Sequence, residues 1–62
     1  MIYSNIVLAC KEKKISVSEL ERKLGFAKSS IYKWDKNRPS VDRVLAVAKE
    51  LETTVEQLMK EG

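Results

Sequence analysis

Apolar residues recur every three or four positions through most of the chain, which predicts helices rather than strands. In residues 2–13 the stripe includes Ile2, Ile6 and Cys10, the spacing of one buried helix face. Leu8 falls outside this stripe, so we expect it either to be exposed or to contact the C-terminal helix. No clear alternation with a period of two residues runs between turn signals, and no strand is expected.

A second helix is predicted over residues 17–24. Ser16 and Glu19 have the spacing of a capping box, in which the Ser16 hydroxyl accepts a hydrogen bond from the Glu19 amide. Gly25 follows directly, where a residue in the left-handed conformation ends many helices.

A third helix is predicted over residues 28–35, after a connection formed by residues 25–27. Ile31 and Trp34 are three positions apart and are expected to face the core. Ala27 would be a weak N-cap, worth about 1 kcal/mol less than serine or threonine.

Two further helices complete the prediction. Ser40 is expected to cap a fourth helix, and Thr54 with Gln57 has capping-box spacing for a short fifth. Their expected core residues are Val44, Val47, Ala48 and Leu51, followed by Val55, Leu58 and Met59. The predicted fold class is therefore all-α: a compact bundle of about five short helices, in one domain spanning residues 1–62.

Composition excludes several classes of function. The chain has 62 residues, no histidine and one cysteine, Cys10. It therefore lacks the commonest general base, cannot form an intramolecular disulfide, and has too few soft ligands for a zinc site. No glycine-rich phosphate loop is present, and no nucleophile stands with a base partner. We expect no catalytic residues, no cofactor, no bound metal and no small-molecule substrate.

Charge is unevenly distributed along the chain. Residues 27–38 contain Lys28, Lys33, Lys36 and Arg38 against one acidic residue, whereas residues 50–62 contain four glutamates against one lysine. A basic central surface suits a polyanion, although a solvated surface with chance clustering is the alternative. No stretch approaches the roughly 18 apolar residues of a membrane span. Residues 7–10 resemble a lipoprotein cleavage site, but no basic residue precedes them, so we expect a cytoplasmic protein.

Four segments carry a family resemblance: SVSEL at 16–20, KLG at 23–25, SSIYKW at 29–34 and PSVD at 39–42. In this order they resemble the phage repressor and Cro family, the XRE type of helix-turn-helix protein, over about residues 2–58. The resemblance implies a lambda-repressor-like fold and a sequence-specific transcriptional regulator, a repressor of a bacterium or phage. It also implies a homodimer on a double-stranded DNA operator, with the third helix in the major groove.

The resemblance also assigns site residues. The positions that contact bases in the family correspond here to Lys28, Ser29, Tyr32 and Lys33. The positions that bind phosphates correspond to Val17, Ser18, Ser30, Lys36, Asn37, Arg38 and Arg43.

Three positions depart from the family pattern. Cys10 and Asp35 stand where a buried arginine–glutamate pair is common, and apolar packing can replace such a pair without loss. Glu21 replaces a small alanine, so either the helix contact is looser or Glu21 points outward. Val17 replaces a polar side chain, which leaves its backbone amide as the phosphate donor.

Two alternatives remain at this point. The fold could serve as a protein-interaction module, an antitoxin or an adaptor, that contacts its partner through the acidic C-terminal region and Leu8. Cys10 could be a redox switch rather than a small buried hydrophobic residue.

Overall fold

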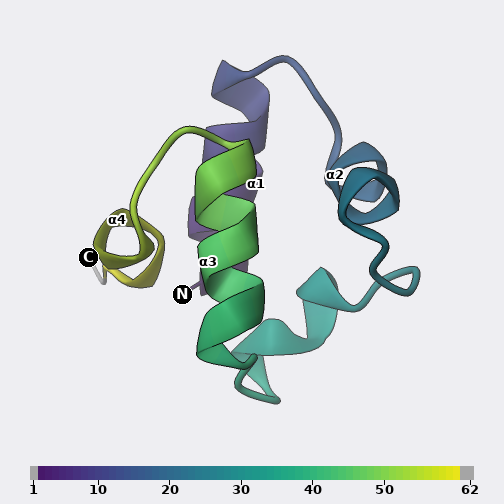
Figure 1. The fold of residues 1–62 in the computed structure, drawn as a ribbon, viewed down its shortest axis with the longest axis vertical. Helices are drawn as coiled ribbons and strands as arrows, with labels where there is room; N and C mark the ends of the chain where they lie inside the picture. The colour runs from purple at the N-terminus through teal and green to yellow at the C-terminus, as the bar shows by residue number, and fades with distance from the viewer. Residues whose placement is uncertain (1, 61–62) are drawn as a thin grey trace.

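The computed structural model describes residues 2–60, which form an all-α fold without strands. Four α-helices and one 3-10 helix follow each other along the chain (Figure 1). Their bounds are α1 Ile2–Glu12, α2 Val17–Leu24, η1 Ile31–Asp35, α3 Val41–Glu50 and α4 Val55–Met59. The predicted all-α class is confirmed, as are four of the five predicted helices.

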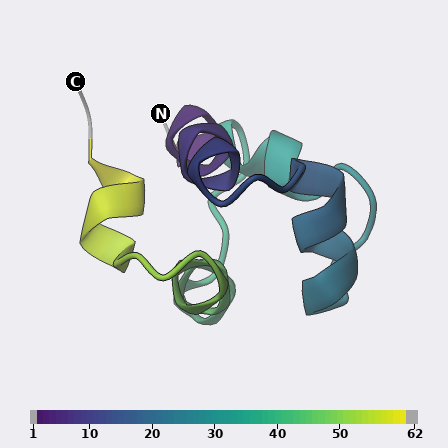
Figure 2. The same ribbon diagram turned by 90° about the horizontal axis from the view of Figure 1, so that it is seen from above.

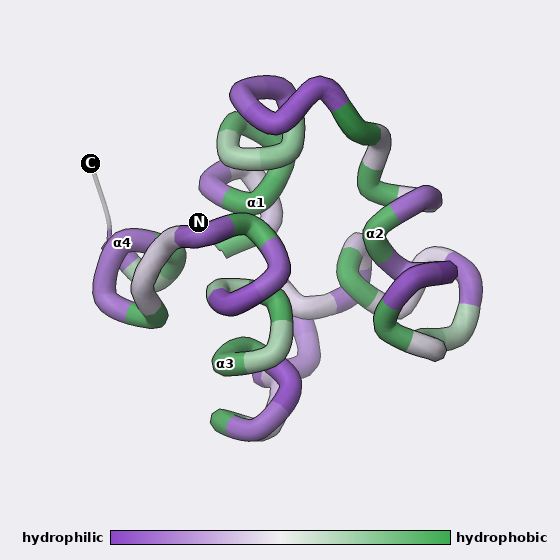
Figure 3. Tube along the Cα trace, turned by 45° about the horizontal axis from the view of Figure 1, so that its top comes forward, coloured by the Kyte–Doolittle hydropathy of each residue, from purple (hydrophilic) through white to green (hydrophobic). Residues whose placement is uncertain are grey.

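Helices α1 and α3 form the middle of the molecule, with side chains of the core between them. Seen from above, both are viewed end-on, while α2 and α4 lie on opposite sides of them (Figure 2). Hydrophobic and hydrophilic residues alternate along the turns of the helices (Figure 3). This alternation is expected of helices that bury one face only.

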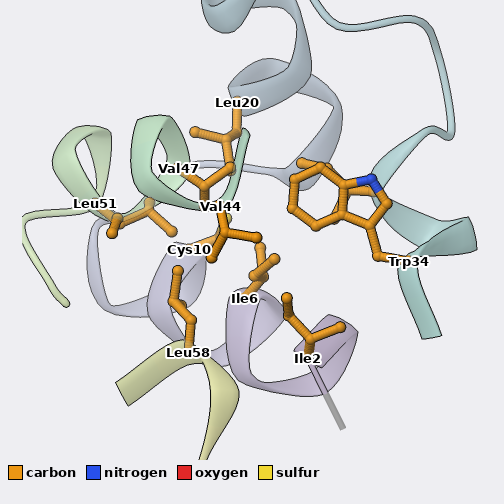
Figure 4. Close-up of a cluster of buried hydrophobic side chains, with 11 residues drawn as sticks. Ile2, Ile6, Cys10, Leu20, Trp34, Val44, Val47, Leu51 and Leu58 are labelled. Carbon is orange, nitrogen blue, oxygen red and sulfur yellow. The ribbon is translucent and has the colours of Figure 1, made fainter. Parts of the chain in front are cut away.

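The core lies between these helices (Figure 4). α1 contributes Ile2, Ile6 and Cys10, and the predicted apolar stripe comes from α3 and from Leu51, which directly follows it. Ile31 and Trp34 are also buried, as predicted. Among residues 2–60 the buried apolar set is Ile2, Ile6, Cys10, Leu20, Ile31, Trp34, Val44, Val47, Ala48, Leu51 and Leu58.

One predicted core residue is wrong, because Met59 is 44% exposed. Helix α4 has only five residues and buries Leu58 fully and Val55 in part. Met59 follows Leu58 directly and is therefore rotated by about 100° away from the buried face.

The helix ends follow local rules. The hydroxyls of Ser16, Ser40 and Thr54 each accept a hydrogen bond from the amide three residues later, at 3.0, 3.3 and 3.1 Å. Gly25 ends α2 in the left-handed conformation, with φ +73°. All four features agree with the sequence predictions, because each depends on residues close together in the chain.

Three hydrogen bonds, from Asn5 of α1 and from Lys13 just after it, reach the C-terminal half. The Asn5 side-chain amide donates to the backbone oxygens of Leu58 and Lys60, each at 2.7 Å. Lys13 Nζ lies 2.6 Å from Glu52 Oε1, and this hydrogen bond and the lysine charge hold the pKa of Glu52 below its usual range. Leu8 is 60% exposed, the first of the two expectations for it, and it lines a hollow that Gln57 and Leu58 of α4 also line.

Cys10 is 2% exposed, and burial raises the pKa of its thiol. The thiolate is the reactive form of cysteine, so burial and the raised pKa both slow the reaction of Cys10 with reagents in solution. We expect iodoacetamide to modify native protein at least about tenfold more slowly than urea-unfolded protein. Mass spectrometry of quenched time points measures both rates. Equal rates would contradict the buried position and restore Cys10 as a candidate redox switch.

Candidate nucleic-acid interface

The segment 28–35, which follows the turn after α2, is not the regular α-helix that the sequence predicts. Residues 28–30 form a turn, and η1 begins only at Ile31 as a 3-10 helix. Ser29 interrupts the helix, because its φ of +64° lies in the left-handed region. The prediction of a third α-helix is therefore wrong in its first turn and in its hydrogen-bond pattern.

Glu21 provides the physical reason. Its side chain is buried, and its two carboxylate oxygens accept hydrogen bonds from the amides of Ser29 and Ile31, both at 3.1 Å. These bonds replace the N-cap that Ala27 lacks. Glu21 thus does not point outward. It lies between α2 and the segment, where it fixes the backbone.

The inner face of this segment is anchored in the core. Trp34 packs against Phe26, with ring centroids 5.9 Å apart, and Ile31 is fully buried. The Arg43 guanidinium lies 5.8 Å from the centroid of the same Phe26 ring, a cation–π distance. The opposite face of the segment, which carries Lys28, Ser29, Tyr32 and Lys33, is exposed.

A hollow of about 460 Å³ joins this exposed face to the following loop and the start of α3. Among the described residues, four cations and no carboxylate line it: Lys28 and Lys33 from the segment, Arg38 from the loop, and Arg43 from α3. Asn37, Ser30 and Ser40 add polar groups. The structure therefore gathers cations separated by up to fifteen positions in the sequence onto one surface, which we call the basic surface.

Ser30 has a particular place in this hollow. Its hydroxyl oxygen is buried and has no hydrogen-bond partner among residues 2–60. Ser30 lines the hollow. To contact a phosphate directly, its side chain would have to rotate outward.

A second hollow lies beside the first, and Lys33 and Asn37 line both. Here the Tyr32 ring packs edge-on against Tyr3 of α1, with centroids 5.2 Å apart. The backbone amide of Tyr3 donates to Asp35 Oδ1 at 3.2 Å. Lys36 also lines this hollow. The start of α1 therefore braces the outer side of η1, a contact that the sequence patterns do not indicate.

A third hollow of about 440 Å³ is lined by Ser18 and Arg22 of α2 together with Lys28. Arg22 was absent from the sequence-based site. Its spacing of four residues from Ser18 places both on one face of α2, which is the signal that would have found it. Val17 is half-buried and packs against the core, so its side chain is not part of this surface.

A family model described as a Cro/C1-type HTH DNA-binding domain matches residues 5–60. The chain belongs to this family. Searches of curated proteins and of solved structures gave no match. In this Cro/C1-type domain, α2 and the segment 28–35 are the two parts of the helix-turn-helix, and the turn between them begins at Gly25.

Two further findings concern residues 2–60. No helix there is long and apolar enough to cross a membrane. No group of three or more histidine, cysteine, aspartate or glutamate side chains is placed there to hold a metal ion.

Proposed function

We propose that this Cro/C1-type domain is part of a sequence-specific transcriptional regulator, a repressor, that places the segment 28–35 in the major groove of double-stranded DNA. The observation that carries the proposal is the basic surface, where four cations and no carboxylate line one hollow. A concave basic surface attracts the phosphate backbone, and its rim supplies donors for base edges.

The exposed face of the segment supplies the base contacts. Lys28 and Lys33 donate to guanine O6 and N7, the commonest specific pairing for a lysine. Ser29 donates or accepts at a base edge, and Tyr32 contacts a thymine methyl group or a phosphate. All four side chains are exposed, and the core contacts of Ile31 and Trp34 keep their backbone fixed.

Phosphate contacts lie on both sides of the segment. On one side are the first amides of α2, at Val17 and Ser18, where the helix dipole favours an anion. Arg22 lies beside them on the same hollow as Ser18. The other side is formed by Lys36, Asn37, Arg38 and Arg43, with Ser30 when its side chain rotates outward.

We propose a homodimer on a near-palindromic operator, as the family resemblance implies, and the size of the domain is in keeping with it. The longest extent of one copy is 26 Å. Successive half-sites on one face of B-DNA lie about 34 Å apart, so one copy contacts one half-site and a second copy is needed for the other.

The experiment that tests base contact compares Lys33→Ala with Arg38→Ala. On a duplex selected from random DNA, Lys33→Ala should lower the preference for one base pair by about 5- to 100-fold. Arg38→Ala should weaken binding by the same factor on every sequence, because a phosphate contact carries no sequence information. Fluorescence anisotropy with the selected duplex and single base-pair variants measures both.

If both variants lost affinity equally on every duplex, Lys33 would not be a base-contacting residue. The same titrations separate the regulator from a protein-interaction module of the same fold. Such a module would bind neither the selected duplex nor random DNA at micromolar protein and low salt.

A further inference from the structure

We infer that Glu21 is a positioning residue for sequence recognition: its buried carboxylate holds the backbone that carries the base-contacting side chains. The inference rests on the proposed function, and it adds a residue that neither contacts DNA nor belongs to the segment that does. It explains why the segment departs from the α-helix that its sequence favours.

The burial of Glu21 is the first observation. Glu21 is 4% exposed, and within residues 2–60 it is the only polar or charged residue that is buried. Glutamate is almost never fully buried unless it is paired. Here the partners are the two backbone amides of the segment, one on each carboxylate oxygen, at 3.1 Å. Both carboxylate oxygens of Glu21 are therefore hydrogen-bonded to the segment.

The strained backbone is the second observation. Ser29 has a φ of +64°, which serine rarely adopts outside a context that enforces it. The hydrogen bond from the Ser29 amide to Glu21 Oε1 supplies that context. Lys28 precedes Ser29 directly, so the left-handed turn sets the direction in which Lys28 leaves the backbone.

The main chain of Glu21 has a separate role that survives substitution of the side chain. Its backbone oxygen accepts from the Phe26 amide at 2.8 Å, which closes the end of α2. Changing only the side chain therefore leaves the α2 cap and its glycine turn in place. The segment 28–35 keeps its core contacts through Ile31 and Trp34, but its first residues lose the hydrogen bonds that hold them against α2.

The test compares Glu21→Gln with Glu19→Gln. Glutamine has the shape of glutamate but only one acceptor oxygen, so it places an amino group opposite one of the two backbone amides. Glu19 lies on the same helix, is exposed, and loses the same charge. Both variants therefore remove one negative charge from α2.

Two measurements are made on each variant. The first is the ratio of affinity for the selected duplex to affinity for random duplex. It should fall about tenfold or more in Glu21→Gln, the effect of one misplaced base contact, and change less than about twofold in Glu19→Gln. The second is the amide spectrum of 15N-labelled protein, in which the Ser29 and Ile31 signals should move upfield in Glu21→Gln alone, as the charge-assisted bonds are lost.

Equal selectivity in the two variants, with wild-type selectivity intact, would overturn the inference and leave the proposed function standing. Absence of DNA binding by the wild type would instead reject the proposed function. If Glu21→Gln does not fold, amide exchange in the wild type decides. The Ser29 and Ile31 amides should then exchange as slowly as core amides, and rapid exchange of both would overturn the inference.

Discussion

Replacing Trp34 with alanine should lower the free energy of unfolding by about 3–5 kcal/mol, the cost of truncating a buried aromatic residue. Trp34 is 5% exposed and packs against Phe26. A domain of this size is expected to have a total stability of about 3–9 kcal/mol, so much of the variant would be unfolded at 37 °C. Urea denaturation followed by far-UV circular dichroism measures the difference.

Val41→Ala is the matched control for this experiment. This substitution also shortens an apolar side chain, but Val41 is 74% exposed in the first turn of α3. Its substitution should change stability by no more than about 0.5 kcal/mol. If Trp34→Ala cost no more than Val41→Ala, the account of the segment as anchored in the core would be wrong.

Salt should weaken DNA binding steeply. If each subunit neutralises about four phosphates, through Arg22, Lys36, Arg38 and Arg43, log affinity should fall against log salt with a slope near −3.6. Between 50 and 200 mM salt this amounts to a loss of about a hundredfold per subunit. Anisotropy titrations on one duplex at four salt concentrations give the slope.

Single-charge variants refine the salt experiment. Arg38→Ala should make the slope less negative by about 0.9, the contribution of one phosphate contact. Lys49→Ala removes a cation from the last turn of α3, away from the basic surface, and should leave the slope unchanged. A slope near zero in the wild type would show that the basic surface does not meet the phosphate backbone.

Local rules predict most of this fold from the sequence. The caps at Ser16, Ser40 and Thr54 and the left-handed Gly25 depend on residues within a few positions of each other. The apolar stripes predict the core of α1 and α3 for the same reason. Local patterns fail at segment 28–35, because its conformation depends on a carboxylate supplied by a different helix.

The candidate site was likewise predictable from the sequence only in part. Its cations could be named from the sequence, since Lys28, Lys33, Arg38 and Arg43 are among the positions that the family resemblance assigns to DNA contact. The contacts that position them could not. Tyr3 meets Tyr32 across 29 positions, and Glu21 meets Ile31 between separate elements. Such contacts leave no periodic signal in a single sequence.

Selection of bound duplexes from a random DNA pool tests the central claim most directly. The account predicts enrichment of a single motif of two inverted half-sites, with centres one helical turn apart. Substituting Lys28 or Lys33 with alanine should relax the motif at defined base pairs within each half-site. Recovery of unenriched sequences by wild-type protein at about 100 mM salt, where specific binding outcompetes non-specific binding, would contradict it.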